Sequence, residues 1–232
     1  MTTTDNIEVL YEDNHIIAIN KRSSDIVQGD KTGDTPLNEI VKQYIKIKYN
    51  KPGEVYLGTI HRIDRPVSGI VLFAKTSKAL ERLNKMFKEK TIQKTYWAIV
   101  KNKPEKNTDH LTHYLKKNPK NNKSSAFIQP KGDAKQSELK YKLIHEFNNF
   151  HLLEITPYTG RHHQIRVQLS AINCPIKGDL KYGFNRSNKD ASISLHARKI
   201  DFIHPVKKEP ITIVANPNCE DSLWKEAVNI FN

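Results

Sequence analysis

Residues 61–69 (HRIDRPVSG) most constrain what this chain can fold into. They lie between two apolar runs, residues 55–60 (VYLGTI) and 70–74 (IVLFA), and each run predicts a buried strand. Pro66 and Gly69 are typical of a turn between two such strands. The pattern therefore predicts a polar turn that two neighbouring strands hold in a fixed place.

Asp64 is the residue in this turn that points to chemistry. Arg62 and Arg65 flank it, and their guanidinium groups would keep its carboxylate ionised and attract phosphate. A carboxylate in a fixed position can act as a nucleophile. An aspartate between arginines is also common as a surface ion pair without function, so the spacing alone leaves both interpretations open.

The charge of the chain indicates the class of partner. Lys and Arg number 38 against 25 Asp and Glu, which gives a net charge of +13. Such an excess predicts a polyanionic partner, although Lys-rich solvated faces are also common. No apolar run approaches the length of a membrane span, and no basic amphipathic segment carries an aromatic face. We therefore expect a nucleic acid as the partner and no membrane.

The N-terminus and the cysteines indicate the compartment. No basic segment followed by an apolar one opens the chain, so we expect no export signal. Cys174 and Cys219 match no metal spacing, which favours the reducing cytoplasm. None of the ten histidines reproduces a metal-ligand spacing either, so we expect neither a metal site nor a metal hydrolase.

Strands dominate the periodicity of the chain. Alternating and apolar runs bounded by turn residues predict strands at 7–11, 15–20, 95–100, 139–143, 150–156, 192–203 and 211–215. The first two strands are expected to form a hairpin across residues 12–14, and the strands at 139–143 and 150–156 a hairpin across residues 148–149. Residues 101–125 are rich in Lys and Asn and predict a long loop or an extended hairpin. Helices are expected after Thr35, with Pro36 in the first position, after Ser77, at 161–172 and at the C-terminal end. The pattern favours an α+β fold with a mixed, largely antiparallel sheet and flanking helices, in a single domain of residues 1–232.

Five ordered motifs carry a resemblance to a known family. Residues 61–69 resemble the H-R-L-D-R-x-T-S-G signature of the RluA family of RNA pseudouridine synthases. Residues 94–96 (KTY) resemble its K-x-Y strand, and residues 160–166 (GRHHQIR) resemble its G-R-x-H-Q-I-R segment. Residues 178–183 (GDLKYG) resemble its G-D-x-x-Y-G segment, and residues 195–197 (LHA) its L-H-A strand. The resemblance extends from residue 7 to residue 210 and implies the catalytic domain of that family, without the small RNA-binding module that many relatives carry before it.

Three positions depart from the pattern of the family. Residues 21–24 (KRSS) stand where the family has a K-P-x-G turn, so the geometry of this turn is open. Val67 replaces the usual Thr, and Gln168 stands where some relatives have His. Since Val is nearly isosteric with Thr, we expect the turn around Asp64 to keep its shape.

The resemblance implies three catalytic residues. Asp64 matches the catalytic aspartate, Arg166 the basic residue that pairs with it, and Tyr96 the active-site tyrosine. On pattern alone, a surface arginine explains Arg166 equally well, and a core aromatic is the better explanation of Tyr96.

The resemblance also suggests residues that bind the substrate. Arg62 matches an arginine that can fill the gap left in the base stack when a nucleotide is flipped out. Leu195 matches an apolar residue near the tyrosine, although core packing is the usual explanation of an isolated leucine in a strand. Contacts with phosphate or with the RNA loop are expected from His61, Arg65, Arg161 and Gln164.

The implied reaction converts uridine in RNA into pseudouridine. It breaks the bond between uracil N1 and C1′, turns the base and rejoins it through C5, so no cofactor is required. We expect a monomer that acts on ribosomal or transfer RNA. A glycosidase would need two carboxylates, and only Asp64 has a suitable context. An RNA-binding protein without activity is the alternative.

Overall fold

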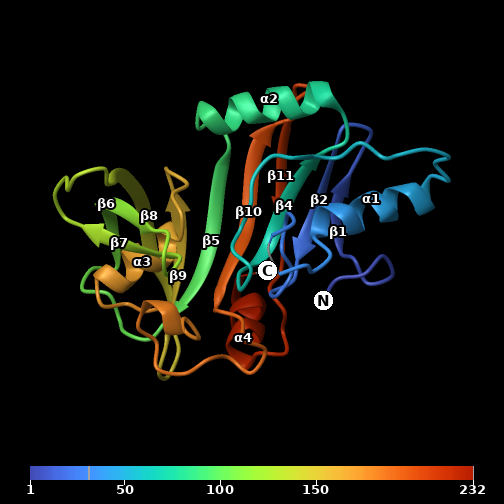
Figure 1. The fold of residues 1–232 in the computed structure, drawn as a ribbon. Helices are drawn as coiled ribbons and strands as arrows, with labels where there is room; N and C mark the ends of the chain where they lie inside the picture. The colour runs from blue at the N-terminus through green and yellow to red at the C-terminus, as the bar shows by residue number, and fades with distance from the viewer. Residues whose placement is uncertain (31, 232) are drawn as a thin grey trace. The chain divides into compact units, whose positions relative to one another are not determined.

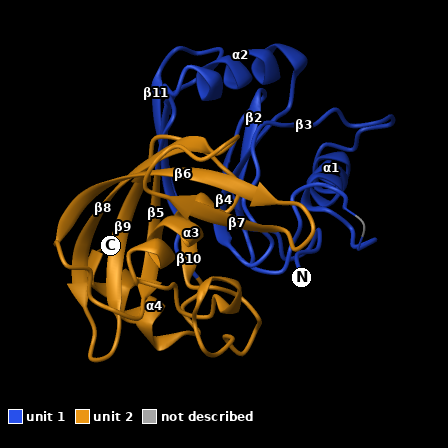
Figure 2. Ribbon diagram, turned by 60° about the vertical axis from the view of Figure 1, so that its left-hand side comes forward, with its two compact units in different colours: residues 1–94, 197–217 blue, residues 95–196, 218–232 orange. Residues whose placement is uncertain are grey.

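The computed structural model describes residues 1–30 and 32–231. These residues form two compact units, which Figure 2 shows in different colours. Unit 1 comprises residues 1–94 and 197–217, and unit 2 comprises residues 95–196 and 218–232. The single domain expected from the sequence stays a prediction.

Unit 1 is built on a sheet in which β1, β2, β4 and β10 follow one another, while β3 pairs with β4 and β11 with β10. The β1–β2, β2–β4, β3–β4 and β10–β11 pairs are antiparallel. The expected first hairpin is confirmed. The strands are β1 (Val9–Glu12), β2 (Ile16–Lys21), β3 (Gly58–Thr59), β4 (Ser68–Ala74), β10 (Leu195–Ile203), which belongs to unit 1 from Ala197 onward, and β11 (Pro210–Val214).

Two helices, labelled α1 and α2 in Figure 1, pack on opposite faces of the strands β2 and β4. Side chains of a strand alternate between its faces, so the apolar run of β2 divides between two cores. Ile17 and Ile19 pack with α1 (Leu37–Lys48), and Ile16 and Ala18 pack with α2 (Ser77–Lys88). Burial on both faces explains why β2 and β4 are apolar almost without interruption.

The starts of both helices differ from the prediction by one residue. Pro36, not Thr35, is the N-cap of α1, and the Leu37 N–H donates to the Ile26 carbonyl, so the first turn needs no side-chain cap. Thr76, not Ser77, caps α2, because its side chain accepts the Ala79 N–H at 3.2 Å. The strand expected at residues 55–60 is also shorter and comprises only β3.

Unit 2 contains an antiparallel sheet in the order β5-β9-β8-β6-β7. The pairing of β8 with β9 confirms the expected hairpin across residues 148–149. Residues 101–125 contain β6 and the start of β7, which form an extended hairpin with a turn at residues 119–122. The strands are β5 (Gln93–Val100), which belongs to unit 2 from Thr95 onward, β6 (Thr108–Asn118), β7 (Lys123–Phe127), β8 (Lys135–Glu146) and β9 (His151–Pro157).

The helices of unit 2 are α3 (Gln164–Ala171), the short 3-10 turn η1 (Leu180–Tyr182) and α4 (Ser222–Phe231). Helix α3 begins later than the expected residue 161, because His163 has a left-handed φ of 54° and cannot continue a helix. The C-terminal helix is confirmed as α4, whose Trp224 and Ala227 pack on Trp97 and Ile99 of β5. The expected α+β fold with a largely antiparallel sheet is therefore confirmed.

Candidate active site

The turn that carries Asp64 is held through its main chain in unit 1. Within the turn, the Val67 N–H donates to the Asp64 carbonyl at 3.0 Å. The Arg65 carbonyl accepts the Ser24 N–H at 2.9 Å and the Lys21 Nζ at 3.2 Å. Asp64 itself is half-buried. Its backbone position therefore depends on the segment 21–25, which begins with the last residue of β2.

Lys21 is a buried cation that the sequence analysis did not assign to the site. Its side chain is fully buried, and Nζ also donates to the carbonyls of Arg22 and Asp25, at 2.8 and 2.9 Å. Burial lowers the pKa of Lys21 to about 7, against the opposing effect of the Asp25 and Asp64 charges. Three carbonyls thus satisfy the three donors of the ammonium group. The lysine of the K-P-x-G motif was the signal that could have identified this role.

The backbone of Ser24 shows how residues 21–24 form their turn without the glycine of the K-P-x-G pattern. Its φ is 78°, in the left-handed region that the glycine of a K-P-x-G turn adopts easily. The Ser24 N–H still reaches the Arg65 carbonyl. The chain therefore makes this turn with a serine in a conformation that costs free energy for a residue with a Cβ.

His61 lies at the start of the Asp64 turn, and its ring contacts β4 and α2. Its Nε2 accepts the Leu72 N–H of β4 at 3.0 Å, and its ring stacks on Phe87 with a centroid distance of 5.0 Å. Burial, and to a lesser extent the charge of Lys94, lowers the pKa of His61 to about 3. A neutral ring offers no charge to a phosphate, which favours a structural role over the expected substrate contact.

The two arginines beside Asp64 have different environments. Arg65 forms an ion pair with Asp34, with 2.6 Å between Nη2 and Oδ2. Arg62 is exposed, as a residue that enters an RNA helix needs to be. The expected roles of both in substrate binding stay predictions.

The structure explains why the motif of residues 61–69 ends with a glycine, Gly69. Its φ is +113°, and a Cβ at this position would overlap the Ala197 carbonyl oxygen and lie 2.5 Å from Ala197 N. Because β4 and β10 are neighbours in the sheet of unit 1, no other residue allows their backbones to approach so closely. Glycine is therefore required for the strand that follows Asp64.

Arg166 is held through its side chain in unit 2. It lies on α3 and is buried, with 5% of its surface exposed. Its Nε donates to Asp179 Oδ2 at 2.7 Å and its Nη2 to Oδ1 at 2.9 Å, so the two groups form a bidentate pair. The centroid of the Tyr182 ring lies 5.1 Å from Arg166 Cζ. Asp179 and Tyr182 belong to the GDLKYG motif, to which the sequence analysis gave no role.

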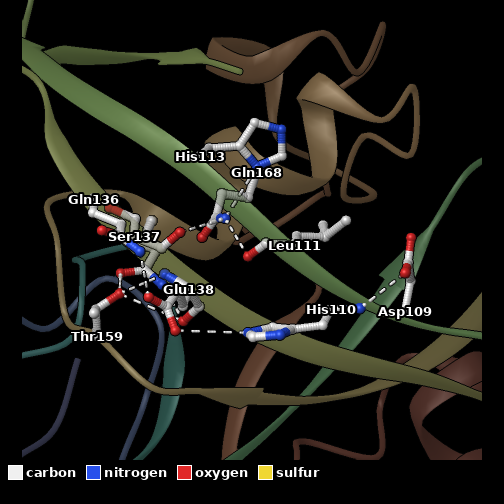
Figure 3. Close-up of polar contacts among 10 residues, drawn as sticks. Asp109, His110, Leu111, His113, Gln136, Ser137, Glu138, Thr159 and Gln168 are labelled. Atoms are coloured by element: carbon white, nitrogen blue, oxygen red, sulfur yellow. Dashed lines mark hydrogen bonds and ion pairs between the residues drawn. The ribbon is translucent and has the colours of Figure 1, made fainter. Parts of the chain in front are cut away.

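Two glutamines fix the helix that carries Arg166. The Gln168 Nε2, fully buried, donates to the carbonyls of Leu111 and Ser137, at 3.2 and 3.3 Å, and contacts His113 Nδ1 (Figure 3). Gln164 Nε2 donates to the Glu138 carbonyl, and its Oε1 accepts from Thr159 and from the Arg161 N–H. This burial favours a structural role for Gln164 in place of the expected RNA contact.

The remaining expected site residues also lie in unit 2. Tyr96 is half-buried in β5 opposite Ile155 of β9. Leu195 is 4% exposed at the start of β10, and Arg161 is exposed, with its Nε near the Gln136 carbonyl at 3.3 Å. Among residues 1–30 and 32–231, no group of three or more His, Cys, Asp or Glu is arranged to hold a metal ion. In the same ranges no helix combines the length and the apolar character that a membrane span requires.

These observations agree with a comparison against models of known families. The model of the RNA pseudouridylate synthase family matches residues 15–171, a range that contains both the Asp64 turn and Arg166. The chain therefore belongs to the RNA pseudouridylate synthase family, and the resemblance to its RluA members is confirmed.

The similar proteins act on RNA according to their names. The chain is 35% identical over 213 residues to the ribosomal large subunit pseudouridine synthase C of Vibrio vulnificus, an alignment that covers 89% of this chain. It is 28% identical over 243 residues to the tRNA pseudouridine synthase C of Pectobacterium carotovorum, which covers 97% of this chain. The chain spans 64% of the first of these relatives and 62% of the second.

A solved structure has the same fold. The human RNA pseudouridylate synthase domain containing 4 superimposes with a TM-score of 0.77, over 96% of this chain and 93% of the human one. Its sequence is 20% identical, so the likeness concerns the fold.

Proposed function

We propose that this protein is an RNA pseudouridine synthase that isomerises specific uridines in ribosomal RNA, transfer RNA or both. The observation that carries the proposal is the Asp64 turn, whose main chain is bonded to Ser24 and Lys21 and which lies within the segment matched by the family model. The names of the relatives support the two classes of RNA.

The reaction assigns a task to each of three residues. The Asp64 carboxylate attacks C1′ or removes a proton from the sugar, and either step releases uracil from its N1–C1′ bond. The base turns and C5 bonds to C1′, as the Asp64–C1′ ester breaks on the first route or as the sugar regains its proton from Asp64 on the second. The C5 proton then leaves and N1 gains a proton. Arg166 keeps the carboxylate ionised, and Tyr96 stacks on the uracil or moves a proton. No electron or phosphate is transferred, so we expect activity without added cofactor and in excess chelator.

Recognition of the RNA requires a flipped uridine and a basic surface. A base in a duplex is out of reach of Asp64, so we expect the preferred uridine to lie in a loop or a weakly paired stem, where flipping costs least. Arg62, Arg65 and Arg161 are proposed to contact the RNA, and Leu195 to pack beside Tyr96. We further expect a monomer in the cytoplasm.

The test is to map pseudouridine in ribosomal and transfer RNA after incubation with the purified protein. Asp64→Asn should reduce product formation by at least about 1,000-fold and leave RNA affinity within a few-fold, since many cations share the binding. Asp133→Asn is the matched control, because Asp133 is an exposed carboxylate on another part of the chain. RNA binding by the wild type without any pseudouridine would favour the alternative, an inactive RNA-binding protein.

A further inference from the structure

Tyr182 joins three segments of unit 2 through one hydroxyl group. The residue lies in η1 and is 3% exposed. Its phenol oxygen accepts the Ser124 N–H of β7 at 2.8 Å and lies 2.8 Å from His163 Nδ1 at the start of α3. The phenol group also carries one O–H donor, which a neutral His163 Nδ1 can accept. Burial raises the pKa of Tyr182 above its ordinary value, so the proton stays on the phenol at neutral pH.

The ring of the same tyrosine supports Arg166. The ring centroid lies 5.1 Å from Arg166 Cζ, within the range of a cation–π contact. Asp179, three residues before Tyr182, holds Nε and Nη2 of the guanidinium group. One short segment, residues 179–182, therefore fixes Arg166 in two ways, through a bidentate carboxylate and through an aromatic face.

The start of α3 depends on the same hydroxyl group. His163 is the N-cap of α3 in a left-handed conformation, and its side chain forms no capping bond. The Tyr182 hydroxyl contacts this residue, and Arg166 follows three residues later, almost one helical turn along. The hydroxyl thus restrains the backbone from which Arg166 extends, while the ring restrains its guanidinium.

We propose that Tyr182 is a positioning residue for Arg166, and that its hydroxyl group transmits the position of the β6–β7 hairpin, through Ser124, to the helix that carries Arg166. The inference rests on the proposed function, in which Arg166 keeps the Asp64 carboxylate ionised. Core packing alone would not need the hydroxyl, since the neighbours of the ring include Leu115, Val167 and Ala126, which are apolar.

The experiment compares Tyr182→Phe with Tyr141→Phe. Tyr141 is the matched control, because it is 2% exposed in the same unit and its hydroxyl donates to a carbonyl, that of Lys106, at 3.1 Å. Single-turnover pseudouridine formation on a stem-loop RNA should fall about 10-fold or more in Tyr182→Phe, with RNA affinity within two-fold of wild type. Tyr141→Phe should keep a rate within two-fold, even when both variants lose similar stability.

A second measurement separates this inference from the proposed function. The exchange of the Arg166 Nε–H with water, followed by NMR, should become at least about 10-fold faster in Tyr182→Phe and stay unchanged in Tyr141→Phe. This readout needs no activity. If the exchange and the rate of Tyr182→Phe both matched those of Tyr141→Phe, the positioning role would be disproved. If the wild type made no pseudouridine but the exchange changed as expected, only the proposed function would fail.

Discussion

The Asp64 turn in unit 1 and the Arg166 position in unit 2 are fixed by different means. The turn is fixed through its backbone, since the Arg65 carbonyl accepts from Ser24 N and Lys21 Nζ. Arg166 is fixed through its side chain, by the carboxylate of Asp179 and the ring of Tyr182. A turn anchored at a main-chain carbonyl tolerates changes in its own side chains, whereas the guanidinium of Arg166 depends on each side chain that holds it.

Gly69→Ala is the most severe test of whether the Asp64 turn is fixed through its backbone. A backbone-held turn should be most sensitive where the backbone itself is crowded, and a Cβ at residue 69 would overlap the backbone of Ala197. We expect the free energy of unfolding to fall by about 3 kcal/mol or more, because a left-handed φ and a steric clash act together. Urea denaturation measures the change.

Gly53→Ala is the matched control for this prediction. A Cβ at residue 53 would meet nothing within 4 Å, and its φ is not left-handed. We expect a change of less than about 0.5 kcal/mol for this variant. Equal stability of the two variants would show that the approach of β4 to β10 is not as tight as the structure has it.

Gln168→Leu tests the side-chain support of unit 2. The substitution removes the hydrogen bonds to the carbonyls of Leu111 and Ser137 in a fully buried place. We expect a loss of about 1–3 kcal/mol in the free energy of unfolding, since buried acceptors lose a donor. Gln136→Leu, in which an exposed amide is replaced, should change the stability by less than about 0.5 kcal/mol. An equal effect of both changes would contradict the role of Gln168 as a support of α3.

The difference between a turn that is local in sequence and a side-chain pair between distant segments also explains how much of the molecule the sequence could predict. The β1–β2 and β8–β9 hairpins and the Asp64 turn are local, so periodicity and turn residues predicted them. The pair of Arg166 with Asp179 joins a helix to a later segment, and no local pattern gives such a contact. Gln164 shows the limit clearly, because a polar side chain in a motif predicted an RNA contact and the fold buries it. Lys21 was missed for the same reason, since lysines are almost always exposed.

His61→Gln tests, through the pH dependence of the free energy of unfolding, whether a neutral ring supports the start of the Asp64 turn. The pKa of His61 is about 3 in the folded protein and about 6.5 in the unfolded chain, so the unfolded chain binds a proton first as the pH falls. Stability from this group is therefore complete above pH 6.5 and is lost progressively between pH 6.5 and 3. Glutamine can still accept from Leu72 N but does not titrate. Between pH 7.5 and 5 the wild type should lose about 1–2 kcal/mol more stability than the variant. Identical losses would mean that His61 is not held neutral beside β4.

The smallest expected effect is a gain, from Ser24→Gly. Ser24 has a φ of 78°, and its N–H donates to the Arg65 carbonyl, a bond that glycine can also make. Relief of the left-handed strain should outweigh the greater freedom of glycine in the unfolded chain, and we expect about 0.5 kcal/mol of added stability. Ser23→Gly is the matched control, because Ser23 does not have a positive φ and a glycine there should only destabilise. Urea denaturation of both variants measures the difference, and pseudouridine formation by Ser24→Gly should equal that of the wild type. A loss of stability in Ser24→Gly would mean that the serine side chain, and not the backbone alone, holds the turn, and the contrast with Arg166 would disappear.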